Sequence, residues 1–242
     1  MADPALRIML IVNEFPPQKV AGTAMATRAL ARALTARGHR VLVVVTTDPP
    51  PGGAPEEGYR LCWMGERPWR GVGTSWRIWH AWRAARAFAP HLIQGQAVSC
   101  GLVAALVGRM VGVPSITYAQ GYDVFEAGRL QARSEIRLGC ALADRLLAVT
   151  RQLADAIEEK CGVAGAEVVP HGFELPQPLP DREAARRRLG LDDTERLVLA
   201  VGRLERFKGH DLLLDGWPEV VRRHPRALLQ IAGGGGRLQA LR

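Results

Sequence analysis

Short apolar stretches alternate along the chain with longer segments whose apolar residues recur at helical spacing. Runs of Val, Ile and Leu without polar alternation are typical of strands covered on both faces of a parallel sheet. Such strands are predicted at 7–13, 41–47, 59–64, 92–94, 114–119, 145–150, 167–170, 196–202 and 227–234. Helices are predicted at 23–37, 75–88, 97–111, 129–142, 151–160 and 210–223, with a short one between Asp181 and Gly190.

This alternation predicts an α/β fold built from βαβ units. Because βαβ crossovers are right-handed, the units combine into a doubly wound, Rossmann-like parallel sheet. In the first helix, Ala26, Leu30, Ala33 and Leu34 are expected to face the sheet, and Gly38 to end the helix. Sheets of this kind bind ligands at the carboxyl ends of their strands, so function is expected in the segments that follow the strands.

A proline-rich segment, ELPQPLPD at 174–181, divides the chain into two predicted domains. Its three prolines favour an extended linker. Residues 1–175 are expected to form one complete domain, and residues 176–242 the first, incomplete part of a second domain. The strands of the second part are apolar on both faces, and so short a segment offers little to cover them. We therefore expect the second part to be less stable than the first.

Composition and charge exclude several classes of protein. With 242 residues, 48% of them hydrophobic, the chain is neither disordered nor fibrous. No apolar run approaches the roughly 20 residues that span a bilayer, and the opening strand is too short for the core of a signal peptide. The net charge of +8 comes from 29 arginines and three lysines. These are interleaved with acidic residues and form no nucleic-acid-binding motif, so nucleic acid is not expected as a partner.

The cysteines indicate neither a disulfide framework nor a metal site. Cys62, Cys100, Cys140 and Cys161 lie far apart, and no two form a CxxC pair. They are expected to be small buried hydrophobic residues in a reducing compartment.

The first candidate for chemistry is the loop at 13–23, which joins the first strand to the first helix. It lacks the GxGxxG spacing of nicotinamide and flavin sites. Gly22 nevertheless lies where backbone amides and the start of a helix can approach an anion. The alternative is that Gly22 only makes the turn.

The second candidate is VGRLERFKGHD at 201–211. Here a buried strand ends at Arg203, and Lys208 is expected to open the next helix. Two fixed cations five residues apart suit a diphosphate leaving group, because Arg grips phosphate oxygens bidentately and Lys adds a point charge. The alternative is a pair of solvated surface cations.

Taken in order, five segments of the chain resemble glycosyltransferase family 4, whose members have the GT-B fold. The matching segments are 11–44, 101–124 with QGYD, 143–157, 167–174 with EVVPHGFE, and 201–217 with VGRLERFKGHD. Each is weak alone, but their order and spacing together are specific. The resemblance implies a GT-B-like architecture of two Rossmann-like domains, the second of them partial in this chain.

The resemblance also implies an activity: a sugar moves from a nucleoside-diphosphate sugar to a glycan or lipid-linked acceptor with retention of configuration. No metal and no cofactor are expected. Arg203 and Lys208 would act as the catalytic cations by neutralising the leaving diphosphate. Gly22 and His171 would contact the donor phosphate or sugar, and Gln120 and Asp123 would lie on the acceptor side.

Three departures from the family pattern bear on this function. Gln120 stands where many relatives carry a His, and an amide cannot act as a base near neutrality. His171 stands in the Asn place of the family's PNG turn, where a contact with ligand and a structural role are equally open. The later donor-site segment, with its two glutamates, lies beyond residue 242. The chain is therefore expected to be truncated at its C-terminal side, and its activity alone is in doubt.

Five of the six tryptophans fall within twenty residues and are mixed with arginines; they are Trp63, Trp69, Trp76, Trp79 and Trp82. Tryptophan beside arginine suits a peripheral membrane surface, and lipid-linked acceptors would give such a surface a purpose. The alternative is core packing with an ordinary basic rim, in which Ile78, Ala81, Trp82, Ala85 and Phe88 share the buried face of the helix.

Three functions remain open from the sequence. The first is a retaining hexosyltransferase that works in cell-envelope glycan synthesis, in the cytoplasm or at the inner face of the membrane. The second is a non-catalytic module that binds acceptor or phosphate and needs a partner chain for the missing donor half. The third is another activity on the same fold, such as a nucleotide-sugar epimerase, because fold alone does not fix function.

Overall fold

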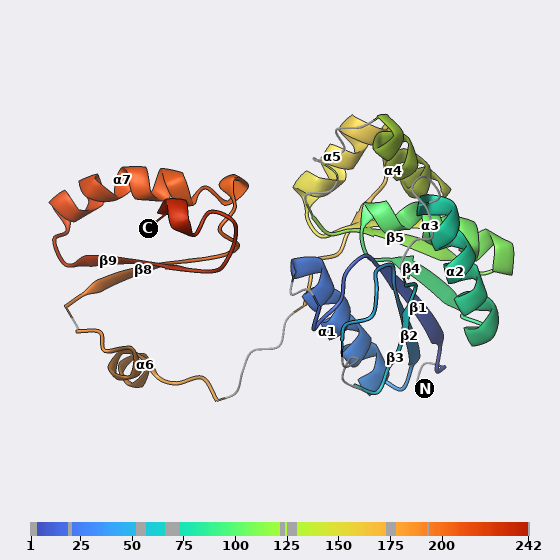
Figure 1. The fold of residues 1–242 in the computed structure, drawn as a ribbon, viewed down its shortest axis with the longest axis horizontal. Helices are drawn as coiled ribbons and strands as arrows, with labels where there is room; N and C mark the ends of the chain where they lie inside the picture. The colour runs from blue at the N-terminus through green and yellow to red at the C-terminus, as the bar shows by residue number, and fades with distance from the viewer. Residues whose placement is uncertain are drawn as a thin grey trace. The chain divides into compact units, whose positions relative to one another are not determined.

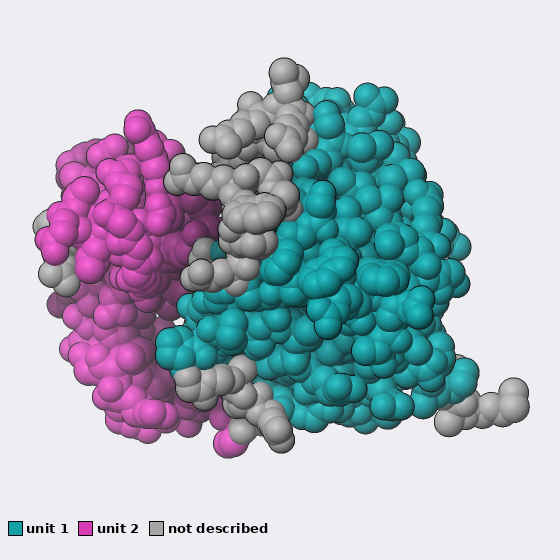
Figure 2. Space-filling view, turned by 45° about the vertical axis from the view of Figure 1, so that its right-hand side comes forward, with its two compact units in different colours: residues 1–173 teal, residues 174–242 magenta. Residues whose placement is uncertain are grey.

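The computed structural model describes residues 4–18, 21–51, 57–65, 73–121, 124, 130–172, 178–192 and 194–241. The chain forms two compact units, Met1–Phe173 and Glu174–Arg242, shown as ribbons in Figure 1 and in separate colours in Figure 2. We refer to them as unit 1 and unit 2 and describe each by itself.

A parallel sheet forms the centre of unit 1. Its strands in the described residues are β1 (Arg7–Val12), β2 (Arg40–Val45), β3 (Arg60–Trp63), β4 (Leu92–Gly95), β5 (Ser115–Ala119), β6 (Arg145–Ala148) and β7 (Glu167–Val168). They pair in the order β3-β2-β1-β4-β5-β6-β7, and every pair is parallel. The chain first builds outward from β1 to β3 and then returns to β4 on the other side. The switch point of this doubly wound sheet therefore lies between β1 and β4.

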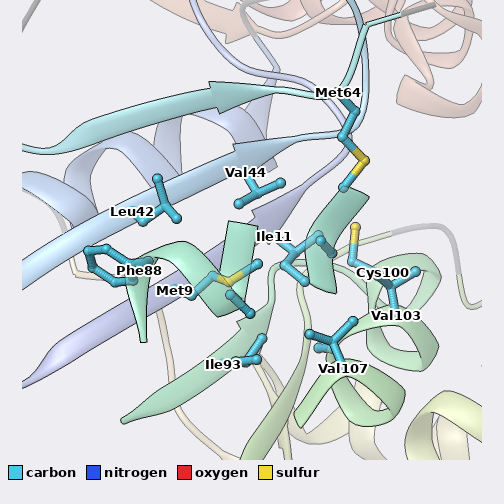
Figure 3. Packing of buried hydrophobic residues seen from close by; sticks show 13 residues of the cluster. Met9, Ile11, Leu42, Val44, Met64, Phe88, Ile93, Cys100, Val103 and Val107 are labelled. Atoms are coloured by element: carbon cyan, nitrogen blue, oxygen red, sulfur yellow. The ribbon is translucent and has the colours of Figure 1, made fainter. Parts of the chain in front are cut away.

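Helices cover both faces of the sheet (Figure 1). They are α1 (Gly22–Ala36), α2 (Gly73–Phe88), α3 (Val98–Val111), α4 (Leu130–Leu142) and α5 (Arg151–Cys161). Alternate residues of β1 point to opposite faces: Leu10 joins the cluster that contains Ala31 of α1, and Ile11 joins the cluster formed with α2 and α3. Figure 3 shows the second cluster, in which Met9 and Ile11 of β1 pack with Phe88 of α2 and Val103 of α3. The strands are covered on both faces, as their apolar runs predicted.

The buried stripe of α1 differs from the expected one. Ala24, Thr27 and Ala31 are buried, whereas Ala33 is exposed and Leu30 packs only at the edge of the cluster. Small side chains let the helix approach the sheet closely, and the Thr27 hydroxyl is satisfied because it donates to the carbonyl oxygen of Thr23 at 2.7 Å. The helix does end before Gly38, whose φ of +86° suits glycine.

Unit 2 contains, in its described residues, α6 (Arg182–Leu189), β8 (Arg196–Val201), a 3₁₀ turn η2 (Arg206–Lys208), α7 (His210–Arg223), β9 (Ala227–Ala232) and a 3₁₀ turn η3 (Gln239–Leu241). Strands β8 and β9 pair in parallel, with Val198 beside Leu229. Side chains of β8 remain open to solvent, and Val201 is 74% exposed. The two strands therefore form a sheet that is only partly covered within the described residues.

The four cysteines are not joined by disulfides in the structure. Cys100, Cys140 and Cys161 are buried, and Cys62 is half-buried in β3. Burial raises the pKa of both the Cys62 and the Cys161 thiol. In the part of the chain that the structure describes, no helix has the length and apolar character needed to cross a membrane.

Candidate functional site

The turn after β8 brings the two predicted cations to one aromatic ring. The guanidinium carbon of Arg203 lies 5.3 Å from the ring centre of Phe207, and Nζ of Lys208 lies 5.5 Å from the same centre. Both side chains are exposed. Phe207 thus contacts two cationic side chains just after the carboxyl end of a strand, and cations at such a place can take up a diphosphate.

Lys208 does not open the following helix, as the sequence suggested, but closes the turn η2. Gly209 separates the turn from α7 because its φ of +71° is left-handed. Helix α7 then starts at His210 with no side chain capping it. His210 is buried, and its Nε2 lies 3.3 Å from the carbonyl oxygen of Arg203, which ties the start of α7 to the turn.

Glycines that follow β9 pack closely against the backbone of the turn that carries Arg203. A Cβ atom on Gly233 would lie 1.8 Å from the carbonyl oxygen of Gly202, and one on Gly235 would lie 2.7 Å from that of Leu204. The Leu204 amide donates to the carbonyl oxygen of Gly234 at 2.9 Å. The glycine run at 233–236, which fails the dinucleotide spacing, therefore serves close packing of two backbones. The run was visible in the sequence, but this use of it was not.

In unit 1, Gln120 follows β5 and pairs with Gln96, a second residue at the carboxyl end of a strand. Its Nε2 donates to Oε1 of Gln96, which follows β4 and is 0% exposed. The Gln120 Oε1 and the Gln96 Nε2 are buried and have no hydrogen-bond partner among the described residues. The pair therefore has one free acceptor and one free donor at the carboxyl edge of the sheet, which suits a hydroxyl group.

His171 follows β7 and contacts Tyr118 of β5. The Tyr118 hydroxyl donates to the carbonyl oxygen of Val169 at 2.7 Å and lies 3.3 Å from Nδ1 of His171. The two rings meet edge to face at 5.5 Å. His171 is exposed as a whole, but the part of the ring against Tyr118 is shielded from water, and this burial lowers its pKa. The lowered pKa favours the neutral imidazole, which can both donate and accept a hydrogen bond.

Gly22 is the first residue of α1, and it is exposed. No side chain caps the helix, because the preceding residue is Ala21. A Cβ on Gly22 would meet nothing within 4 Å. The open start of a 15-residue helix can therefore receive an anion, although the packing would also allow a larger residue.

The structure distributes the predicted residues over the two units. Gly22, Gln120 and His171 belong to unit 1, whereas Arg203 and Lys208 belong to unit 2. Asp123 lies outside the described residues, so its acceptor-side role stays a prediction. Across the described ranges, no three or more His, Cys, Asp and Glu side chains gather in a way that could hold a metal ion.

The tryptophan region divides into packed and exposed parts. Trp63 and Trp82 pack against the core clusters, and Trp69 lies outside the described residues. Trp76 stacks on Trp79 at 5.7 Å, and Trp79 is 44% exposed. The Arg83 guanidinium lies 4.8 Å from the Trp79 ring centre.

Two family models together match most of the chain. Residues 20–176 match Glycosyltransferase Family 4, and residues 181–242 match Glycosyl transferases group 1. The D-inositol 3-phosphate glycosyltransferase of Segniliparus rotundus is 30% identical in an alignment of 168 positions that covers 63% of this chain and 35% of that protein. A GDP-mannose-dependent alpha-(1-6)-phosphatidylinositol monomannoside mannosyltransferase of Mycolicibacterium smegmatis is 29% identical over 97% of this chain and 62% of its own length.

Solved structures share the fold. The Anabaena HepE structure in complex with UDP and glucose matches with a TM-score of 0.69 at 16% identity, over 98% of this chain and 63% of that one. The UDP-GlcNAc 2-epimerase of Methanocaldococcus jannaschii also matches, with a TM-score of 0.59 at 13% identity, over 98% of this chain and 67% of that one. The likeness confirms the expected GT-B-type α/β fold, but the presence of an epimerase means that the fold alone does not select a reaction.

The chain spans about a third of the inositol phosphate relative and less than two thirds of the mannosyltransferase. The Glycosyltransferase Family 4 match alone covers more than half of this chain. The segments at 11–44, 101–124 and 167–174, whose order was recognised in the sequence, lie mainly within the matched residues. The chain belongs to glycosyltransferase family 4.

Proposed function

We propose that the chain takes part in transferring a hexose from a nucleoside-diphosphate sugar to a glycan or lipid-linked acceptor, with retention of configuration. The observation that carries the proposal is the convergence of Arg203 and Lys208 on Phe207. Fixed cations stabilise the negative charge that develops on a departing diphosphate without reorganising during the reaction. Two relatives named as glycosyltransferases and the UDP and glucose in the HepE complex support a nucleotide-sugar donor.

In the proposed mechanism the protein forms no covalent bond with the substrates but positions them and neutralises charge. The leaving diphosphate helps to take the proton from the acceptor hydroxyl, while Arg203 and Lys208 neutralise it. Gly22 and His171 are proposed to contact the donor, and Gln120 and Asp123 the acceptor. Gln120 is suited to orient a hydroxyl group through its free oxygen rather than to remove its proton. The proposal includes no metal and no cofactor.

The test measures UDP and GDP binding to the full chain by titration calorimetry. Arg203→Gln and Lys208→Gln are each expected to weaken binding by about tenfold or more, because each removes a charge-assisted contact. Arg206→Gln, on an exposed cation of the same turn, serves as the matched control and is expected to stay within about twofold of wild type. Unchanged binding by both Arg203→Gln and Lys208→Gln would show that the turn does not hold the diphosphate.

The second candidate is a non-catalytic module that binds acceptor or phosphate and needs a partner chain. The exposure of apolar side chains on β8, including Leu199 and Val201, favours it because such side chains are normally covered. Incubation with labelled UDP-sugars and GDP-sugars separates the two functions. Acceptor binding with neither hydrolysis nor transfer would favour the module.

We also propose that the exposed side of α2 makes peripheral contact with the inner face of a membrane. Trp79 and Arg83 supply an interfacial ring and a cation, and the sequence of α2 contains no acidic residue. The protein would then act in the cytoplasm beside lipid-linked acceptors of the cell envelope. Co-sedimentation with anionic vesicles at low salt tests this: Trp79→Ala should reduce binding, and no binding by wild type would remove the idea.

A further inference from the structure

Arg77 reaches from α2 to the point where two other elements meet. Its Nη2 donates to Oδ1 of Asn13, just after β1, at 2.6 Å, and to the carbonyl oxygen of Ser99 in α3 at 3.2 Å. The same Oδ1 accepts from the Thr46 hydroxyl at 3.1 Å, and Nδ2 of Asn13 donates to the Ser99 hydroxyl at 2.8 Å. These contacts fix the guanidinium at the first turn of α3.

This half-buried charge has no acidic partner in the described residues. None of the ion pairs there involves Arg77, and neither α2 nor α3 contains an Asp or a Glu. The Nε of Arg77 is buried and has no hydrogen-bond partner among the described residues. A half-buried cation with an unused buried donor is unfavourable, and a negatively charged ligand would compensate the charge and the donor.

Two further features beside Arg77 favour a negative group. Helix α3, 14 residues long, begins after Ala97, which cannot cap it, so no side chain offsets the positive end of this buried helix start. Gln96 directly precedes Ala97 and is fully buried, and its Nε2 has no hydrogen-bond partner among the described residues. Arg77 thus reaches Asn13 at the end of β1, while Gln96 and the start of α3 follow the end of β4. This is the switch point of the sheet, where open α/β folds bind ligands.

We propose that Arg77, Gln96 and the start of α3, here called the α3 corner, bind an anionic group of the acceptor, either a phosphate or a carboxylate. The inference rests on the proposed function, because it assigns the ligand of unit 1 to the acceptor and leaves the donor diphosphate to Arg203 and Lys208. The inference goes beyond that function because it states that the acceptor carries a negative charge and that Arg77 determines the specificity for this charge. Planar guanidinium groups suit both kinds of oxyanion.

Inorganic phosphate is the first probe, titrated into the full chain and followed by NMR or calorimetry. Arg77→Gln is expected to weaken phosphate binding by about tenfold or more, and Arg77→Lys to restore part of it because the charge remains. Arg109→Gln removes an exposed arginine from the last turn of α3 and is the matched control, expected to stay within about twofold of wild type. Equal phosphate binding by folded Arg77→Gln and wild type would overturn the proposal.

Asn13→Asp keeps the proposal testable if Arg77→Gln fails to fold. It places a carboxylate against Arg77 and so supplies from within the chain the negative charge that the corner lacks. Its melting temperature is expected to equal or exceed that of wild type, while phosphate binding falls by about tenfold or more. Unchanged phosphate binding in this variant would also overturn the proposal.

The acceptor itself is tested with pairs of sugars or cyclitols that differ only in one phosphate monoester or one carboxylate. Wild type should bind the charged member of a pair at least about tenfold more tightly, and Arg77→Gln should bind both alike. Charge-dependent binding without sugar transfer would support the α3 corner and contradict the proposed function. If wild type and Arg77→Gln transfer sugar to neutral and charged acceptors with the same kinetics, the proposed function is supported and the α3 corner is contradicted.

Discussion

At the scale of single residues, a three-membered polar cluster joins α1 to the segment before β3. Arg28 forms an ion pair with Glu57, and its Nε lies 2.8 Å from Oε2 of the carboxylate. The Tyr59 hydroxyl donates to the same oxygen at 2.6 Å. Chiefly through its hydrogen bonds with Arg28, the pKa of Glu57 falls from 4.5 to about 2. The Glu57 side chain is only 16% exposed, so water screens this cluster less than an ordinary surface pair.

This shift predicts an acid-dependent stability. A carboxylate whose pKa is lower in the folded state stabilises the protein above its unfolded pKa, and this contribution is lost as the pH falls from about 4.5 toward 2. Glu57→Gln should therefore lower the free energy of unfolding by about 1 kcal/mol at pH 7. This value already allows for solvent screening, because Arg28 is partly exposed. Urea unfolding between pH 7 and pH 3 measures it, and the difference from wild type should shrink toward acid pH.

Glu167→Gln is the control, because its pair with Arg145 is exposed on both sides. It should leave the unfolding free energy nearly unchanged at every pH. A Glu57→Gln effect that is absent at pH 7, or equally large at pH 3, would contradict this account.

Candidate site residues can be proposed from the sequence where a single segment carries the signal, and their roles stay predictions. Arg203 and Lys208 stand out because a strand end places them, and His171 because it follows the last strand of unit 1. Gln96 and Arg77 gain their meaning only from contacts with Gln120 and Asn13, which lie 24 and 64 positions away. No local spacing reports contacts of that kind. The role of Asp123 stays a prediction.

At the scale of elements, α3 and α4 touch through their backbones. A Cβ on Gly139 of α4 would lie 2.5 Å from the backbone nitrogen of Leu102 in α3. On its other side, α3 approaches β5, where a Cβ on Gly101 would lie 2.5 Å from Oγ1 of Thr117. At Gly139 this spacing leaves no room for a methyl group, because the atoms it would meet belong to the α3 backbone and cannot rotate away.

Gly139→Ala should therefore lower the stability of unit 1 by about 2–3 kcal/mol, although alanine is the better helix former. Gly216→Ala adds the same methyl group to α7, where nothing lies within 4 Å, and should stabilise unit 2 by about 0.5–1 kcal/mol. Thermal and urea unfolding measure both. A neutral Gly139→Ala variant would mean that the two helices can separate without loss.

The elements themselves followed closely from periodicity. The strand expected at 7–13 ends at Val12, and the helix expected at 210–223 has these bounds. The buried stripe of α1 was misplaced because alanines occur all around the helix, so hydrophobicity gives no clear direction there. Thr27 can be buried because its hydroxyl bonds to the helix backbone. A pattern that counts threonine simply as polar does not predict this burial.

At the scale of the whole molecule, the two units differ in how well they cover their sheets. Leu10 and Val43 of unit 1 are fully buried, whereas Leu199 and Val201 of unit 2 are more than half exposed. Burial of apolar surface is the main source of stability, so the two units should not unfold together. The sequence suggested this contrast because the strands of residues 176–242 are apolar on both faces.

Amide hydrogen exchange of the full chain should show the contrast. The amides of β8 and β9 are expected to exchange at least about tenfold faster than those of β1 and β2, whose side chains lie in the two core clusters of unit 1. Addition of UDP or GDP should slow exchange around Arg203 if the proposed diphosphate grip is correct. Equal protection of β8 and β1 without any ligand would refute the predicted difference.

The buried thiols make the chain suitable for fluorescence measurements between its units. Thiols that are shielded and protonated react slowly with maleimide dyes, and this describes Cys62 and Cys161, while Cys100 and Cys140 are buried. Cysteines introduced at exposed Arg109 and Leu212 would therefore take up dye first. Energy transfer between one dye on each unit would then report whether the distance between the units changes when a nucleotide sugar or an anionic acceptor is added.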